Sequence, residues 1–162
     1  MVVALVLSMA LQNLINVAVT SADVLMLERV GTEVLSGASL AGQVQFIMTL
    51  IFFGLTSGAA VLTAQYWGKG DTRTIEKVMG IALRFSLIVA AVFFLAAEAV
   101  PELIMRLFTG DEAVVGQGAV YLRIVAPSYL FSSVTMVYLN IMRSVERVVV
   151  SMVVFLISLL AN

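Results

Sequence analysis

Asp23 is the residue of this sequence best suited to binding and releasing a small cation. It lies in an apolar segment that runs from about Val2 to Leu27. A carboxylate inside a membrane helix is costly to bury and is by default a candidate functional group. Poor solvation favours its protonated form, so such a group could alternate between protonated and charged states. The alternative is that Asp23, near the end of the segment, is simply solvated there.

The same segment carries an unusual set of polar side chains. Gln12, Asn16 and Asp23 follow one another at spacings of four and seven residues, and Thr20 lies close by. These spacings place them on one face of a helix. A polar face of this kind belongs inside a helix bundle or against a water-filled cavity. We therefore predict that Asn16 and Thr20 line a central cavity.

The composition excludes most other chemistry. The 162 residues are 62% hydrophobic and 12% charged, with a mean hydropathy of +1.10, whereas a soluble domain is about half apolar and a quarter charged. The lipid bilayer is therefore the expected environment. The sequence has no cysteine and no histidine, which removes the usual nucleophiles, general bases and metal ligands. We predict that it is not an enzyme and holds no metal or cofactor. No basic patch suggests a nucleic-acid partner.

Apolar segments long enough to span a bilayer, which needs about 20 helical residues, follow one another along the chain. The expected fold is all-α, a polytopic bundle of transmembrane helices, with residues 1–162 as one membrane domain. The fifth apolar segment is still running when the chain stops, so we expect a piece of a larger membrane protein. The segments cover about residues 2–27, 35–67, 78–100, 113–142 and 148–162.

The connections between these segments carry recognisable stop and start signals. Thr32 is a plausible N-cap of the second helix, and Pro101 stops the third. Residues 102–108 alternate charged and apolar side chains at helical spacing, which predicts a short interfacial helix. Thr109 or Asp111 is expected to cap the next helix.

Small residues and a proline interrupt the long helices. Gly54 with Gly58, and Ala38 with Gly42, form pairs that allow close helix packing in lipid. Ordinary packing within the bundle is favoured over dimerisation. Pro127 is expected to kink the fourth long helix, because its ring removes a backbone hydrogen bond.

Two glutamines of the second segment are further candidates for the cavity. Gln43 and Gln45 could line it, although an interhelical hydrogen bond is the alternative. At the end of this segment, Tyr66 and Trp67 have the amphipathic rings that favour the headgroup level of a bilayer.

The distribution of lysine and arginine predicts the orientation. Five of these residues lie in the loops after the second and fourth long helices, and two lie in the loops after the first and third. Because basic loops stay in the cytoplasm, the N-terminus is expected to be cytoplasmic. The two sets are Lys69, Arg73, Lys77, Arg143 and Arg147 on one side, and Arg29 and Arg106 on the other.

Several strings of the chain resemble the multidrug and toxic compound extrusion (MATE) family, especially the branch related to DNA-damage-inducible protein F. The strongest is SGAAVLTAQYWGKGD at residues 57–71. Others are LQNLINVAVTSADVLMLERVG at 11–31, YLRIVAPSYLF at 121–131 and RSVER at 143–147. Members have twelve helices in two six-helix lobes. The resemblance implies that this chain supplies about five helices of an incomplete N-terminal lobe, with the C-terminal lobe as a missing partner.

The resemblance also implies a function. Family members export amphipathic organic cations from bacterial cells across the inner membrane by alternating access, coupled to protons or sodium ions. Asp23 resembles the first-helix aspartate that binds the coupling ion. Asn162 matches the first of two asparagines of the fifth helix and would hold Asp23 by hydrogen bonds. The alternatives are a flippase-type exporter of the same superfamily and a structural membrane fragment without transport activity.

Overall fold

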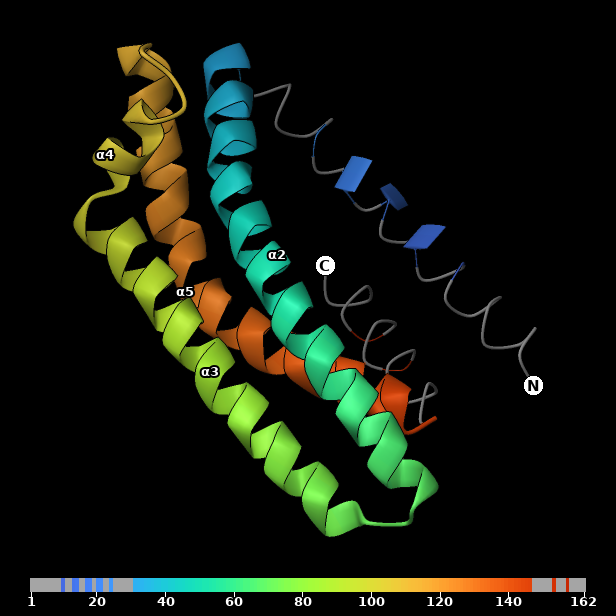
Figure 1. Cartoon of the computed structure of the whole chain (residues 1–162). Coiled ribbons are helices and arrows are strands. Elements are labelled where there is room, and N and C mark those ends of the chain that lie inside the picture. Colours follow the sequence, from blue (N-terminus) through green and yellow to red (C-terminus); the bar gives the residue numbers. More distant parts are fainter. Residues whose placement is uncertain are drawn as a thin grey trace.

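Two long helices, α2 (Thr32–Gly68) and α3 (Thr72–Ala99), form an antiparallel hairpin, and α5 (Glu112–Ser144) packs against both (Figure 1). The short α4 (Pro101–Arg106) precedes α5 at the end opposite the hairpin turn. The computed structural model describes residues 31–146 and the separate positions 10, 13, 14, 17, 18, 20, 21, 24, 153 and 157.

The described part of the chain is an all-α transmembrane bundle, as predicted from the composition. It contains helices and no strand, and α2, α3 and α5 are each long and apolar enough to cross a membrane. At about 1.5 Å per residue, the 37 residues of α2 extend well beyond a hydrocarbon core of roughly 30 Å. The ends of α2 therefore reach past the hydrocarbon, or the helix is strongly tilted.

The start of α2 differs from the prediction. Thr32 is the first residue of the helix, and Gly31 takes the cap position with a φ of 146° and no side-chain hydrogen bond. Only glycine adopts this backbone conformation without strain, so the chain turns at Gly31 rather than at a capping hydroxyl. The prediction that Thr32 caps the helix was wrong.

The start of α3 also lies earlier than expected, at Thr72 instead of Val78. The Asp71 carboxylate accepts hydrogen bonds from the Thr74 backbone N–H at 3.1 Å and the Thr74 hydroxyl at 2.6 Å. The first of these bonds satisfies a backbone amide group that a helix start leaves free. Both bonds lower the pKa of Asp71, the Thr74 hydroxyl contributing most. Lys77 therefore belongs to the helix and not to a loop.

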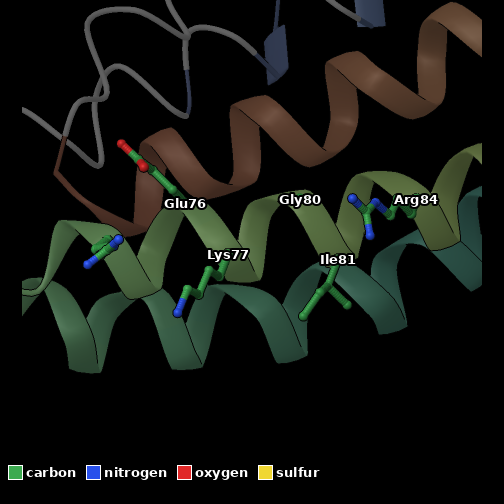
Figure 2. A pocket seen from close by; sticks show the side chains of 6 residues that line it. Glu76, Lys77, Gly80, Ile81 and Arg84 are labelled. Carbon is green, nitrogen blue, oxygen red and sulfur yellow. The ribbon is translucent and has the colours of Figure 1, made fainter.

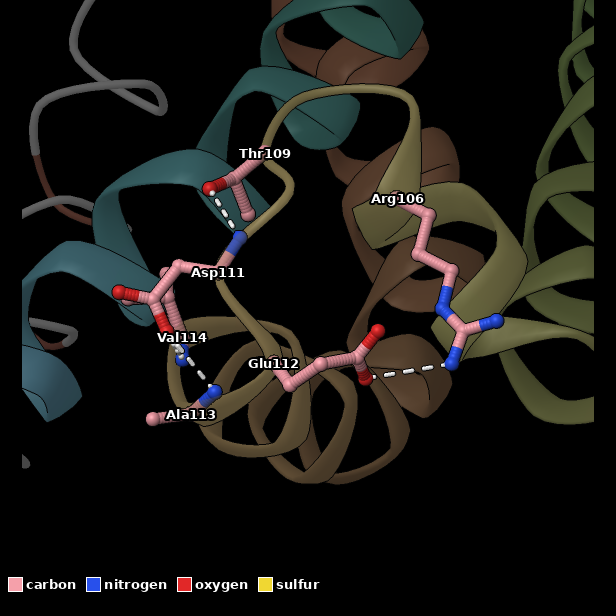
Figure 3. A network of polar contacts seen from close by, with 6 residues as sticks. All are labelled: Arg106, Thr109, Asp111, Glu112, Ala113 and Val114. Carbon is pink, nitrogen blue, oxygen red and sulfur yellow. Dashed lines mark hydrogen bonds and ion pairs between the residues drawn. The ribbon is translucent and has the colours of Figure 1, made fainter.

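The connection from α3 to α5 confirms two predictions. A short helix follows the third span, with Pro101 at its first turn, where a missing N–H is harmless. Asp111 caps α5 by accepting from the backbone N–H groups of Ala113 and Val114 (Figure 3). Arg106 and Glu112 form an ion pair of 3.2 Å beside this cap. Both side chains are exposed, so the pair adds little stability.

The helix α5 is longer than the predicted segment and bends. It runs two residues past the expected end at Met142, and Pro127 lies near its middle. Figure 1 shows α5 changing direction part-way along its length. Proline removes one hydrogen bond of the helix and its ring displaces the preceding turn, which accounts for the predicted kink.

Two glycines, Gly37 on α2 and Gly118 on α5, allow these helices to approach closely. A Cβ atom on Gly37 would lie 2.8 Å from the backbone nitrogen of Gly118 and 3.1 Å from the carbonyl oxygen of Val114. A Cβ on Gly118 would collide with the end of the Met105 side chain. The predicted small-residue pair of Ala38 and Gly42 does not form this crossing, because a Cβ atom at Gly42 would meet no atom within 4 Å.

The core divides into two apolar clusters along the bundle. The first lies toward α4, and the second lies toward the hairpin turn between α2 and α3. Each cluster takes buried side chains from all three long helices, so both tie the bundle together. The first contains Ala41, Val44, Met48, Phe52, Ala90, Ala97, Met105, Val115, Leu122, Ala126 and Tyr129; the second contains Ala59, Ile75, Ala82, Val137, Ile141 and Val145.

Candidate functional site in the helix bundle

The predicted ion-coupling residues lie on the flanking segments. Asp23, Asn162 and the cavity candidate Asn16 are outside the described residues. Thr20 is described as an exposed helical residue. The role assigned to each of these four residues therefore stays a prediction.

The two glutamines of α2 lie away from the centre of the three-helix core. Gln43 is exposed, and Gln45 is half-buried. The Gln45 main-chain carbonyl accepts a hydrogen bond from the Thr49 hydroxyl at 2.9 Å. The buried stripe of α2 instead passes through Val44 and Met48. Two residues apart, the glutamines lie on nearly opposite faces of α2, and the assignment of either to the central cavity stays a prediction.

A layer of three buried hydroxyl groups separates the two apolar clusters. Thr56 on α2, Ser86 on α3 and Ser133 on α5 are each 0–2% exposed. Each lies three or four residues from a member of either cluster on its own helix, so the three lie at a similar level of the bundle. Sequence analysis did not identify this layer, because one hydroxyl per long helix carries no pattern of its own.

Each hydroxyl of this layer is satisfied within its own helix. Thr56 donates to the Phe52 carbonyl at 2.8 Å, a bond of the kind that buried serine and threonine make to the preceding turn. The other two donate to carbonyls three residues earlier, at 3.0 Å on α3 and 2.7 Å on α5. The layer is therefore polar but uncharged, and it supplies no titratable group.

A direct polar contact joins α2 to α5 near the hairpin turn. The Thr63 and Ser144 hydroxyl oxygens lie 2.6 Å apart. Thr63 is fully buried and also bonds the Ala59 carbonyl at 2.9 Å. Ser144 was predicted to lie in a basic loop, whereas α5 continues to this residue. The contact fixes the end of α5 against α2.

The carboxylates of residues 31–146 lie outside the core. None of the eight is buried, and each lies in a capping position, in a connection or within two turns of a helix end. Within this range no group of three or more acidic side chains could hold a metal ion. Of the ten acidic residues of the sequence, Asp23 and Glu28 are the two that lie outside the described residues. The eight are Glu33, Asp71, Glu76, Glu98, Glu102, Asp111, Glu112 and Glu146.

The two ends of the bundle differ in charge. The Thr63–Ser144 contact places the end of α5 beside the hairpin turn, so Arg143 shares that end with Lys69, Arg73 and Lys77. At the hairpin turn, the Lys69 ammonium lies 5.4 Å from the centre of the Tyr66 ring, a cation–π arrangement. The hairpin end also carries Asp71, Glu76 and Glu146, whereas the opposite end carries Arg106 and five carboxylates, Glu33, Glu98, Glu102, Asp111 and Glu112.

Comparison with known proteins identifies relatives along the whole chain. The family model described as MatE matches residues 5–162. The "Probable multidrug resistance protein NorM" of Rhizobium meliloti is 27% identical over 155 residues, which cover 93% of this chain and 32% of that protein. The protein of the same name from Bradyrhizobium diazoefficiens is 29% identical over 86 residues, covering 53% of this chain and 18% of the relative. The matched part is thus at most about a third of the length of these relatives.

Proposed function

Because the chain belongs to the MATE family of membrane transporters, whose model matches residues 5–162, we propose that it is part of a cation-coupled multidrug efflux antiporter. The match over nearly the whole chain is the observation that carries this proposal. It is supported by the relatives, whose names describe multidrug resistance. The substrates in this proposal are amphipathic organic cations.

Asp23 is the proposed site of the coupling ion, either a proton or Na⁺. Within residues 31–146 every carboxylate lies toward a helix end or in a connection, and none is buried. This distribution supports a coupling carboxylate on another segment, and Asp23 lies within an apolar one. Binding would bias the transporter between outward-open and inward-open states, since a ligand shifts states only through differential affinity.

The other predicted residues take supporting roles in this proposal. Asn162 would hold Asp23 by hydrogen bonds, and Asn16, Thr20, Gln43 and Gln45 would line the substrate cavity. A second lobe would face this chain across that cavity, and the two would rock during transport. The proposed location is the bacterial inner membrane, with the basic hairpin turn and the N-terminus in the cytoplasm.

Drug efflux from a hypersensitive bacterial strain tests the proposal. The chain is expressed alone and together with a candidate second lobe, as wild type, Asp23→Asn and the control Glu102→Gln. Glu102 is an exposed carboxylate of α4, so its amide variant should retain efflux. Loss of efflux in Asp23→Asn alone, at equal membrane expression, supports the assigned site. Equal efflux in all three refutes it, whereas no efflux from any combination refutes the export function.

Repeating the assay with an imposed sodium or proton gradient identifies the coupling ion. Efflux that follows only the pH gradient indicates a proton, and efflux that requires external Na⁺ indicates sodium. Efflux that is independent of both gradients would contradict ion coupling at Asp23.

A further inference from the structure

A basic groove lies on the outer face of α3 near the hairpin turn. It has a volume of about 480 Å³ and is lined by Arg73, Glu76, Lys77, Gly80, Ile81 and Arg84. These positions recur at intervals of three and four residues, so they share one face of the helix. Three cations and one carboxylate give the groove a formal charge of +2.

Gly80 is the one lining residue of this groove without a side chain. A Cβ atom at Gly80 would meet no atom within 4 Å, so the missing side chain leaves an open notch one turn before Arg84. Figure 2 shows the Arg84 side chain extending back along α3 toward Gly80. Glu76 points away from Lys77 and Ile81 in the same view. An anion in the notch could therefore approach the Arg84 guanidinium without meeting the carboxylate first.

The depth of Arg84 suits a group at the membrane surface. Between Arg84 and Glu98, α3 carries 13 residues without a charge. If the hydrocarbon core ends near Glu98 and takes about 20 residues, it begins near Val78. The Arg84 Cα then lies about 9 Å inside the boundary. Helical side chains lean toward the N-terminus of their helix, which lets the guanidinium reach the headgroup level at this end.

An apolar groove adjoins the basic one. It has a volume of about 370 Å³ and lies between α2 and α3. The two grooves share Ile81. The apolar groove reaches deeper into the bilayer along α2, toward Gly54, which lies 14 residues before the end of that helix. Its lining is Gly54, Leu55, Gly58, Ala59, Leu62, Val78, Ile81 and Ala82.

We propose that these two grooves together bind one anionic phospholipid of the leaflet at the hairpin turn. The phosphate lies in the notch at Gly80 and accepts hydrogen bonds from the planar guanidinium of Arg84, a geometry suited to phosphate oxygens. Lys77 and Arg73 add charge at the headgroup level. One acyl chain passes Ile81 and lies along Gly54 and Gly58. Charge selects the headgroup, and the shape of the apolar groove holds the chain.

Native mass spectrometry of the purified, delipidated chain in detergent tests this site. The probes are phosphatidylglycerol and phosphatidylcholine with identical acyl chains. The wild type is expected to bind phosphatidylglycerol about tenfold more tightly. Arg84→Gln removes one cation and should weaken this binding about fivefold, and Gly80→Leu should weaken it by filling the notch. Arg106→Gln, which changes an exposed arginine at the opposite end of the bundle, should have no effect.

Glu76→Gln protects the test against misfolded variants. Removing the carboxylate from the groove should tighten phosphatidylglycerol binding, and a variant that fails to fold cannot produce this gain. Gly58→Leu obstructs the apolar groove and should weaken binding of the long-chain lipid. It should leave the weak binding of glycerol phosphate unchanged, because that anion has no acyl chain.

Several outcomes would overturn the proposal. Equal wild-type affinity for the two lipids would remove the charge selection. Equal losses of phosphatidylglycerol affinity in Arg84→Gln and Arg106→Gln would show a general effect of the charge of the protein. Inorganic phosphate that competes as strongly as the lipid would identify a simple anion site. If Gly58→Leu converts a dimer to a monomer and leaves lipid binding unchanged, the apolar groove binds a second copy of the chain instead of a lipid.

Discussion

Replacing Gly37 with alanine tests the close crossing of α2 and α5. The added methyl group would lie 2.8 Å from the Gly118 nitrogen and 3.1 Å from the Val114 carbonyl oxygen. Both atoms belong to the backbone of α5, so neither can move without shifting the helix. Gly42→Ala is the matched control, because Gly42 lies on the same helix and a Cβ there meets nothing within 4 Å.

The expected magnitude follows from two opposing terms. Alanine is favoured over glycine in a helix by about 1 kcal/mol, and both variants gain this term. Forcing an extra methyl group into a packed site costs about 1–3 kcal/mol, and only Gly37→Ala incurs this cost. The free energies of unfolding of the two variants should therefore differ by about 1–3 kcal/mol. Gly118→Ala should fall between them, because its closest obstacle is the flexible end of Met105.

Unfolding by sodium dodecyl sulfate in mixed micelles, followed by circular dichroism, measures this difference. Because helices persist in this detergent, the helix-propensity term shrinks, but it shrinks equally for both variants. The difference between Gly37→Ala and Gly42→Ala therefore reports the crossing. Agreement of the two unfolding free energies within about 0.5 kcal/mol, the usual effect of a surface substitution, would refute the tight contact.

Three further substitutions test other parts of the bundle. Thr63→Val removes the hydroxyl contact between α2 and α5. In the same titration it should lower the free energy of unfolding by about 0.6 kcal/mol, and by at most about 1.7 kcal/mol. An unchanged free energy of unfolding would mean that the contact adds no stability. Asp71→Ala removes the cap of α3 and should lower the thermal unfolding temperature at neutral pH. The hydrogen bond from the Thr74 hydroxyl is the largest cause of the lowered Asp71 pKa. The difference in unfolding temperature between the wild type and Asp71→Ala should therefore be fully present well above pH 3.8. It should vanish as the pH falls through the lower pKa that Asp71 has in the folded state. A difference that does not change with pH would contradict this. The sequence has no cysteine, so a single introduced cysteine reports the side of the membrane on which it lies. Gly110→Cys should react with an impermeant maleimide added to intact cells, and Lys69→Cys should react only after lysis. The reverse pattern would invert the proposed orientation.

The features of the fold that could be predicted have local causes. The short helix after Pro101, the cap at Asp111 and the bend of α5 around Pro127 depend on the residues themselves and their neighbours. The start of α3 was missed for a different reason. Lys77 and its basic neighbours were interpreted as a loop, although the Asp71 carboxylate already starts the helix. A capping residue is thus a better indicator of a helix start than the charge of the residues that follow it.

Contacts between helices could not be predicted in the same way. Gly54 and Gly58 have the spacing typical of a packed interface, yet a Cβ at either position meets nothing within 4 Å. Gly37 and Gly118, which do meet, belong to different helices and share no sequence pattern. A spacing shows that a helix can be approached closely, but not which neighbour approaches it. The same limit applies to Gln43, whose polarity does not determine the side of α2 on which a cavity lies.

The hydroxyl layer lies near the middle of the bundle, between the two apolar clusters. Pro127 supplies no N–H to the preceding turn of α5, and Ser133 lies less than two turns further on. The three hydroxyls donate within their own helices, so none of these bonds joins one helix to another. Toward the hairpin turn the helices are fixed by the Thr63–Ser144 contact, and toward α4 by the crossing at Gly37. The Thr63–Ser144 contact and the crossing at Gly37 thus lie on either side of the hydroxyl layer, and the three hydroxyls of the layer add no hydrogen bond between helices.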